Sequence, residues 1–305
     1  MSVILCGYHN MGCIALKVLR ELKVSVPAVF THRDDPDENQ WFDSLGDLAG
    51  GMDIPVYFPE DINAGKWVNL MKDLAPDILL SCYFRQMIRE DILAIPRIAA
   101  VNLHGSMLPR YRGRCPVNWQ LVHGETQGGV TLHHMVRKAD AGDIVAQQAV
   151  PIDEGDTALT LFRKMEKATE GLLREYIPKI LAGTAPRIPQ DHSQASYFGG
   201  RRPEDGRIDW SWPARRVYNL IRAVTWPYPG AFGFLDEKKV MIWSAEPLDH
   251  EDAGLPPGTI LARGEDRLVQ TGQGLLRLIT VSEAHGTPED AVSPEEIFLE
   301  DKRLT

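Results

Sequence analysis

Short apolar runs alternate with helix-like segments through residues 1–182, and this alternation limits the chain to very few folds. Runs of this kind occupy residues 3–6, 28–30, 54–57, 78–81 and 99–103, and two longer ones follow at 129–136 and 144–151. Residues 13–22 show apolar side chains at helical spacing, and Asp156 begins a long amphipathic pattern that ends at residue 181. Strands that alternate with helices form parallel sheets. We therefore expect an α/β, Rossmann-like domain with a mainly parallel sheet.

The pattern changes after residue 182. Gly183, Pro186 and Pro189 end the helical pattern, and residues 190–206 are polar and rich in turn formers. One helix is expected over residues 213–224, and short strands are expected near 232, 240–243, 259–261, 268–271 and 275–279. This spacing is typical of a small OB-like β-barrel. We predict an α/β domain over residues 1–182, a linker lining the site over 183–206, and the OB-like domain over 207–305.

Charge and hydropathy exclude two classes of partner. The chain has 33 Lys and Arg against 42 Asp and Glu, a formal net charge of −9, which disfavours binding to nucleic acid. No apolar run reaches the roughly 18 residues that a membrane span needs, so we expect no membrane insertion. Residues 1–6 are typical of a core strand rather than a signal peptide, which predicts a cytoplasmic protein.

The cysteines give no sign of a metal or of a disulfide framework. No CxxC pair occurs among the four cysteines, which are Cys6, Cys13, Cys82 and Cys115. All four fall on apolar or helix-start positions, so we expect reduced packing cysteines and no metal site.

The turn at residues 7–12 stands where a dinucleotide-binding fingerprint would lie. That fingerprint, GxGxxG, needs a glycine at its centre so that the backbone can approach a pyrophosphate. His9 occupies this position, and its Cβ would block the approach. The sequence therefore predicts the sheet but not bound NAD.

The segment 102–113 carries the clearest chemical signal. Asn102 and His104 end a buried strand two residues apart, so their side chains leave on one face, at the sheet edge where open α/β folds bind ligands. An amide donor beside an imidazole can stabilise an oxyanion while the imidazole moves a proton. Asp140 follows another strand and can lie beside His104, raising the pKa of the imidazole toward working pH. Asp143 is the alternative partner, and the residues alone leave the choice between the two aspartates open.

These motifs resemble one enzyme family. Asn102-x-His104-Gly-Ser-x-Leu-Pro-x-Tyr-Arg-Gly, Gly129-Val-Thr-Leu-His and Asp140-Ala-Gly-Asp-Ile-Val-Ala-Gln are similar to the motifs of 10-formyltetrahydrofolate-dependent formyltransferases. The resemblance covers essentially the whole chain. It implies a catalytic set of Asn102, His104 and Asp140, with 10-formyltetrahydrofolate as co-substrate and no metal. It also implies that the folate contacts Gln86, Met87, Ile88 and Arg114, together with the loop formed by Val136, Arg137, Lys138, Ala139 and Asp140.

Further segments resemble the branch of the family that formylates UDP-4-amino-4-deoxy-L-arabinose, in lipid A modification and polymyxin resistance. These segments include residues 11–13, 30–32, 83–85, 116–119 and 198–203. We expect Arg201 and Arg202 to bind the diphosphate of the nucleotide sugar through fork-shaped hydrogen bonds; the alternative is a salt bridge to Glu204 or Asp205. The chain ends at Thr305, so we expect a separate protein to supply the decarboxylation that accompanies this formylation.

Other functions of the same fold stay open at this stage. The main alternatives are formylation of methionyl-tRNA and of another nucleotide-linked amino sugar. The resemblance implies a basic loop after the second strand in the branch of the family that formylates methionyl-tRNA. Residues 33–40 of this chain instead hold four acids and one base, which argues against tRNA as the acceptor. A folate hydrolase or a binding module is the third possibility. His123, His133 and His134 are given no role, and the sequence leaves homo-oligomer formation open.

Overall fold

The computed structural model describes residues 1–35, 39–284, 286–298 and 302–305. The chain forms two compact units. The first comprises Met1–Pro116, Gln127–Pro151 and Phe162–Gly199, and the second comprises Val117–Thr126, Ile152–Leu161 and Gly200–Thr305. The chain crosses between the units several times, so we keep the boundaries at residues 182 and 206 as a prediction.

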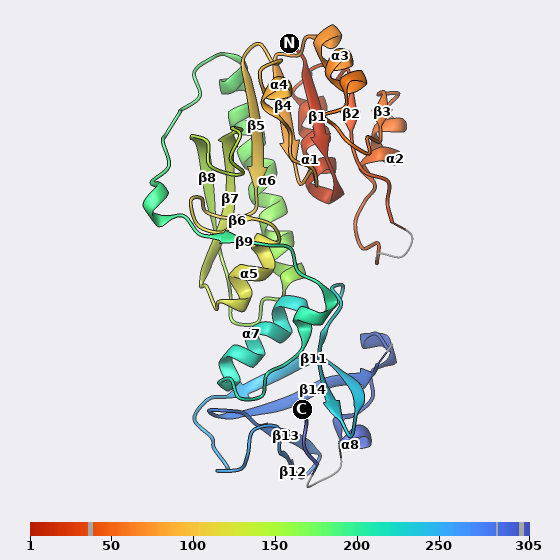
Figure 1. Ribbon diagram of the computed structural model, residues 1–305, viewed down its shortest axis with the longest axis vertical. Coiled ribbons are helices and arrows are strands. Elements are labelled where there is room, and N and C mark those ends of the chain that lie inside the picture. Colours follow the sequence, from red (N-terminus) through yellow and green to blue (C-terminus); the bar gives the residue numbers. More distant parts are fainter. Residues whose placement is uncertain (36–38, 285, 299–301) are drawn as a thin grey trace. The chain divides into compact units, whose positions relative to one another are not determined.

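A seven-stranded sheet organises the described part of the first unit (Figure 1). Its order is β3-β2-β1-β4-β5-β7-β8, where the strands are β1 (Val3–Gly7), β2 (Val29–Phe30), β3 (Val56–Tyr57), β4 (Ile78–Cys82), β5 (Ala99–His104), β7 (Gln127–His134) and β8 (Ile144–Pro151). Strands β1 to β5 run parallel, whereas β7 is antiparallel to β5 and β8 is antiparallel to β7. The predicted mainly parallel sheet is confirmed.

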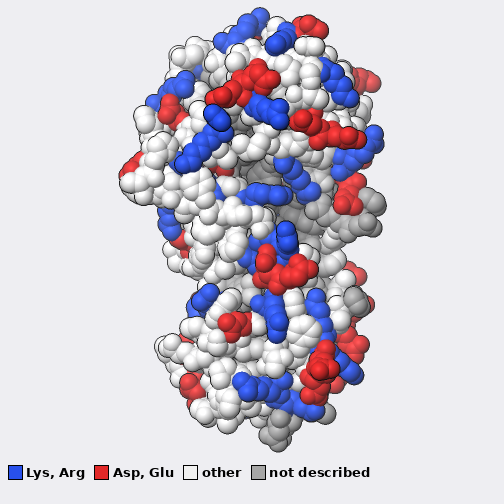
Figure 2. Space-filling model, in the orientation of Figure 1, with Lys and Arg blue, Asp and Glu red and all other residues white. Residues whose placement is uncertain are grey.

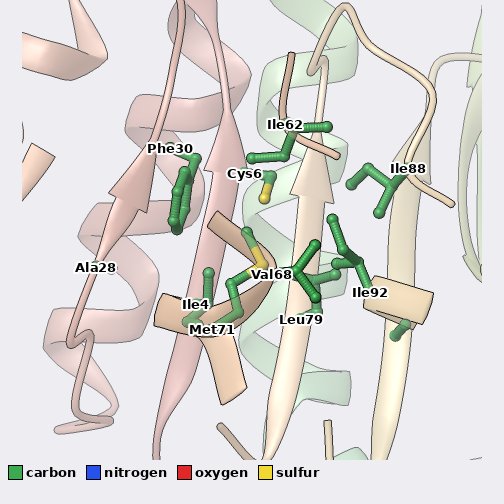
Figure 3. Close-up of a cluster of buried hydrophobic side chains, with 11 residues drawn as sticks. Ile4, Cys6, Ala28, Phe30, Ile62, Val68, Met71, Leu79, Ile88 and Ile92 are labelled. Atoms are coloured by element: carbon green, nitrogen blue, oxygen red, sulfur yellow. The ribbon is translucent and has the colours of Figure 1, made fainter. Parts of the chain in front are cut away.

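Helices cover both faces of this sheet. They are α1 (His9–Glu21), α2 (Leu45–Gly50), α3 (Gly65–Leu74), α4 (Glu90–Leu93) and α6 (Ala158–Leu181), whereas α5 (Pro116–Val122) belongs almost entirely to the second unit. In Figure 3, α1 and α6 pass behind the strands and α3 lies in front of them. Helix α1 begins at His9, four residues before the predicted start, because His9 takes a left-handed φ of +61° that lets the strand turn directly into the helix.

The front face of the sheet packs an apolar core against α3 and α4. In Figure 3, side chains from β1, β2 and β4 point toward Val68 and Met71 of α3 and toward Ile92 of α4. The strand residues in this cluster are Ile4, Cys6, Phe30, Leu79 and Ala100, and Ala28 lies directly before β2. Their period of two along each strand places every second side chain on this face. The core fixes the strands, and with them the ends of β4 and β5.

A second, two-stranded ladder brings a late segment to the end of β5. Strand β6 (Arg112–Gly113) pairs in parallel with β9 (Tyr197–Phe198), and the single-turn helix η1 (His192–Gln194) precedes β9. At Gly113 the backbone φ is +98°, and a Cβ there would lie 2.2 Å from the Phe198 carbonyl oxygen. Only glycine fits this close approach. Residues 190–199 therefore lie against the loop that follows β5.

The second unit contains helix α7 (Ala214–Val224) and an antiparallel sheet of order β10-β11-β14-β13-β12. Its edges are linked, because Leu304 bridges to Leu235 at the end of β10 and Arg303 bridges to Thr259 beside β12. The predicted C-terminal β domain is confirmed. Its strands are β10 (Ala231–Leu235), β11 (Lys238–Leu248), β12 (Ile260–Arg263), β13 (Asp266–Gln270) and β14 (Leu275–Glu283), with η2 (Pro203–Gly206), η3 (Pro288–Asp290) and α8 (Pro294–Ile297) outside the sheet.

Charges of both signs are mixed on the face drawn in Figure 2. Within the described ranges, no helix is both long and apolar enough to cross a membrane. Residues 36–38, in the middle of the acidic loop 33–40, lie outside the described part of the chain.

Candidate active site

The loop that follows β5 is held to strands β7 and β8 by side-chain hydrogen bonds. The Thr131 hydroxyl on β7 donates to the Ser106 carbonyl at 2.6 Å and accepts from the Leu108 amide at 3.1 Å. Gln147 on β8 donates from Nε2 to the Leu108 carbonyl at 2.8 Å. Buried polar groups paired in this way hold a loop in one conformation. The carboxyl end of β5 therefore lies on a rigid support.

His104 is the last residue of β5, and its side chain is buried. Its Nε2 lies 2.7 Å from the Tyr111 carbonyl oxygen. Because a carbonyl oxygen only accepts, Nε2 must carry a hydrogen, and Nδ1 is then the basic nitrogen of the neutral imidazole. Nδ1 faces Asp140 at 3.6 Å from Oδ1, which is longer than a direct hydrogen bond.

Asp140 lies in the turn that follows β7. Its Oδ2 accepts a hydrogen bond from the Gly113 amide at 2.8 Å, which aims Oδ1 toward His104. Asp143, the alternative partner, instead accepts from Arg187 Nε at 2.9 Å. Of the two carboxylates considered from the sequence, Asp140 is the one that faces His104.

Asn102 reaches this group through His133, to which the sequence analysis gave no role. His133 Nδ1 lies 2.8 Å from the His134 carbonyl, so Nδ1 carries the hydrogen and Nε2 accepts. The Asn102 Nδ2 donates to that Nε2 at 3.1 Å. His133 Nε2 is also 3.5 Å from Asp140 Oδ1. Asn102 and His133 lie side by side because the register of β5 and β7 pairs them directly.

The two ionisable partners shift in the same direction for different reasons. Burial lowers the pKa of His104, and the Asp140 carboxylate and the Tyr111 carbonyl offset this only in part. Burial by itself would raise the pKa of Asp140, but the positive charge that His104 and His133 carry when protonated, together with the hydrogen bond from the Gly113 amide, holds this pKa far below its usual range. The sequence analysis expected Asp140 to raise the pKa of His104 toward working pH. Burial reverses that expectation, and His104 rests as the neutral imidazole beside an ionised Asp140.

The predicted folate-contacting loop after β4 is tied to its neighbours through Gln86. The Gln86 side chain accepts a hydrogen bond from the Ile62 amide at 2.7 Å and donates one to the Pro59 carbonyl at 2.8 Å. These bonds hold its own loop in place. Met87 is exposed, while Ile88 is buried in the core. This leaves the Met87 position as the accessible part of the loop.

The second predicted folate segment lies between β7 and Asp140. Val136, Arg137 and Lys138 are exposed, and Ala139 is half-buried. Lys138 Nζ lies 4.9 Å from the centre of the Tyr197 ring on β9. Arg114 is also exposed, and its backbone amide donates to the Phe198 carbonyl at 2.9 Å. Lys138 and Arg114 thus both contact β9, the strand beside the turn that holds Asp140.

Arg201 and Arg202 belong to the second unit. The Arg201 guanidinium donates to the Asp205 carbonyl at 2.8 Å and lies 4.7 Å from the centre of the Trp119 ring. The Arg202 amide donates to the Asp205 carboxylate at 2.7 Å. Among the described residues, no group of three or more His, Cys, Asp and Glu side chains is arranged to hold a metal ion. The four cysteines are free.

Sequence profiles of known families match both parts of the chain. The profile described as formyl transferase matches residues 10–177, more than half of the sequence. A second profile, described as the formyl transferase C-terminal domain, matches residues 201–295.

Solved structures with the same fold share about a fifth of the sequence. An N-formyltransferase from Helicobacter canadensis, solved in complex with folinic acid and dTDP-3-aminofucose, is 21% identical with a TM-score of 0.71 and covers 91% of this chain and 98% of its own. The sugar 3N-formyl transferase WlaRD is 19% identical with a TM-score of 0.73, and the match covers 94% of this chain and 98% of the WlaRD chain. HypX from Aquifex aeolicus, in complex with tetrahydrofolic acid, is 18% identical with a TM-score of 0.64, and covers 97% of this chain and 46% of its own.

Proposed function

The chain belongs to the formyl transferase family, and on that basis we propose that it transfers a formyl group from 10-formyltetrahydrofolate to the amino group of a nucleotide-linked amino sugar. The observation that carries the proposal is the set of Asn102, His104 and Asp140 gathered at the carboxyl end of β5. Two of the solved relatives are described as sugar or N-formyl transferases with bound formyl or folate compounds, which supports the choice of both substrates.

The residues at this site fit an acyl-transfer reaction. 10-Formyltetrahydrofolate supplies the activated formyl group. The second N–H of the Asn102 amide is suited to stabilise the oxyanion that develops when an amine attacks the formyl carbon, because His133 takes only the first. Nδ1 of the neutral His104 accepts the proton that the attacking amine must lose, and returns it to the folate nitrogen as the carbon–nitrogen bond breaks.

Asp140 supports the charged state through which His104 passes. When Nδ1 takes a proton, the carboxylate at 3.6 Å becomes the counter-ion of the imidazolium, and Nε2–H keeps its bond to the Tyr111 carbonyl. The lowered pKa of His104 leaves Nδ1 free to accept a proton near neutral pH. We assign His104 as the proton carrier, Asn102 as the oxyanion donor and Asp140 as the counter-ion.

The co-substrate contacts that we propose use the two loops beside this set. One side of the proposed folate site is lined by the backbone groups of Gln86, Met87 and Ile88. The other side is lined by residues 136–140. Arg114 completes the folate contacts. The exposure of Met87 and of residues 136–138 agrees with such a role, because these positions are open to a ligand.

For the acceptor we propose UDP-4-amino-4-deoxy-L-arabinose, with Arg201 and Arg202 on its diphosphate. This substrate would give the protein a role in lipid A modification and polymyxin resistance. Of the alternatives, methionyl-tRNA is disfavoured by the net charge of −9, and another nucleotide-linked amino sugar is the closer competitor. We also propose a cytoplasmic location, which the four free cysteines support.

An acceptor panel tests this function. The protein is incubated with 10-formyltetrahydrofolate and one acceptor at a time: UDP- and dTDP-linked 4-amino and 3-amino sugars, and charged initiator tRNA. We expect formylation of the UDP-4-amino sugar to be the fastest. Loss of the formyl group without any acceptor would indicate a hydrolase, and transfer only to tRNA would replace the sugar as substrate.

A further inference from the structure

We propose that Gln190 is a positioning residue that holds the turn of Asp140 in its working conformation, acting together with the buried Arg112. This inference rests on the proposed function, because Asp140 is the counter-ion in that reaction. Gln190 lies fifty residues from Asp140 in the sequence, in the polar segment before β9.

The Asp140 turn has an unfavourable backbone that needs support. Asp140 has a φ of +53°, in the left-handed region that is unfavourable for a residue other than glycine. Two residues later, a Cβ at Gly142 would lie 2.0 Å from the His134 carbonyl oxygen. The turn is therefore tightly packed against β7, and its shape decides where the Asp140 carboxylate points.

Gln190 supplies the support with both hydrogens of its amide. Nε2 donates to the Asp140 carbonyl at 2.9 Å and to the Gly142 carbonyl at 2.6 Å. The side chain is 7% exposed, so water competes little for these bonds. These two bonds hold the backbone of the turn, while the Gly113 amide holds the Asp140 carboxylate.

The amide oxygen of Gln190 is held in turn by Arg112. Oε1 accepts from Arg112 Nη2 at 2.5 Å, and the same guanidinium contacts the Tyr197 hydroxyl at 2.6 Å and His192 Nδ1 at 2.9 Å. Arg112 is 0% exposed, and within the described ranges it forms no ion pair with a carboxylate. Position 190 therefore requires a side chain that donates two hydrogen bonds and accepts one. The glutamine amide does both, whereas a carboxylate has no hydrogen to donate.

The arrangement also sets the charge around His104. The groups that face this imidazole are the Asp140 carboxylate, His133 on β7, Arg112 on β6 and the Tyr111 carbonyl. Asp140 raises the pKa of His104, and the unneutralised charge of Arg112 lowers it. A neutral side chain at position 190 keeps the Arg112 charge unpaired, whereas a glutamate there would neutralise it.

Three variants test this proposal by steady-state kinetics and by NMR titration of the His104 imidazole in the substrate-free protein. Gln190→Met removes both donors and should lower kcat about 10- to 100-fold with little change in KM for the folate, since small misplacements of a catalytic group cost this much. Gln190→Glu keeps the contact to Arg112 and should move both the acid limb of kcat and the imidazole titration to higher pH. Gln194→Met is the matched control, because among the described residues the Gln194 side chain bonds within its own turn, to Asp191.

The two proposals fail separately in this design. If wild type transfers no formyl group, the proposed function is wrong, while the NMR titration still reports on Gln190. If both Gln190 variants titrate His104 as wild type does and turn over at the wild-type rate, Gln190 does not position Asp140. If Gln190→Met does not fold, kcat of Gln190→Glu above its acid limb decides. A carboxylate cannot donate to the Asp140 and Gly142 carbonyls, so a wild-type kcat there would show that Gln190 does not position Asp140.

Discussion

The side-chain amide of Asn102 donates from Nδ2 to Nε2 of His133 across 3.1 Å, between directly paired positions of β5 and β7. His133 can accept this bond because its Nδ1 hydrogen is engaged by the His134 carbonyl. The orientation of the Asn102 amide is thereby fixed, with its N–H groups on the side of the imidazoles. A preoriented donor stabilises a developing oxyanion without reorganising during the reaction.

Replacing His133 should therefore slow the reaction without weakening substrate binding. His133→Leu removes the acceptor of the Asn102 amide, and we expect kcat to fall about 10- to 100-fold while KM for both substrates stays within a factor of about two. His250→Leu, at an exposed position of the second unit, is the control. A normal kcat for His133→Leu would remove His133 from the site.

The two carboxylates that follow β7 should behave differently. Asp140→Asn and His104→Ala should each lower kcat by roughly 10²-fold or more, because one removes the counter-ion and the other the proton carrier. Asp143→Asn, which breaks only the exposed pair with Arg187, should leave kcat near wild type. Equal losses in the two aspartate variants would contradict the assignment of Asp140.

The pH dependence of kcat follows from the resting state of His104. Its pKa is lowered from 6.5 by burial, and only the neutral imidazole accepts the amine proton, so kcat should rise with pH through a pKa that lies below 6.5. Asp140→Asn removes the carboxylate that raises this pKa, and its acid limb should lie at lower pH still. A rate profile from pH 4.5 to 8 measures both. An acid limb above pH 7 in wild type would show that the imidazolium is the resting form.

Much of this architecture was predictable from local sequence. Alternating apolar runs and helical spacing gave the mainly parallel sheet, because each element needs only its own periodicity to be recognised. The positions of Asn102 and His104 followed from their spacing of two on one strand. Local sequence left Asp140 and Asp143 open as the carboxylate at the same edge; the family resemblance selected Asp140, and it is Asp140 that faces His104.

The parts that escaped prediction depend on long-range register and on burial. His133 joins the site because β7 pairs antiparallel with β5, which sets Asn102 opposite His133 and cannot be read from either strand alone. The alternation of residues 129–133 was the available signal, since it places His133 on the same face as Thr131. Gln190 arrives through an irregular segment without periodicity. The pKa of His104 moved against expectation because the depth of its burial was unknown from the sequence.

The acceptor site should respond to the paired arginines of the second unit. Arg201→Ala should raise KM for the nucleotide sugar about 10-fold and leave the Kd for the folate unchanged, because a charge-assisted hydrogen bond to phosphate is worth about 1.5 to 3 kcal/mol. Arg263→Ala, which loses only an exposed ion pair with Glu251, is the matched control. An unchanged KM for Arg201→Ala would remove the diphosphate role.

Tracing the formyl carbon itself tests the account most directly. The protein is given 10-formyltetrahydrofolate labelled in the formyl carbon together with UDP-4-amino-4-deoxy-L-arabinose, and the products are separated and identified by mass spectrometry. We predict that the label appears on the sugar amine at a rate that His104→Ala lowers at least 10²-fold. Label recovered only as free formate, or transfer at the same rate by His104→Ala, would contradict it.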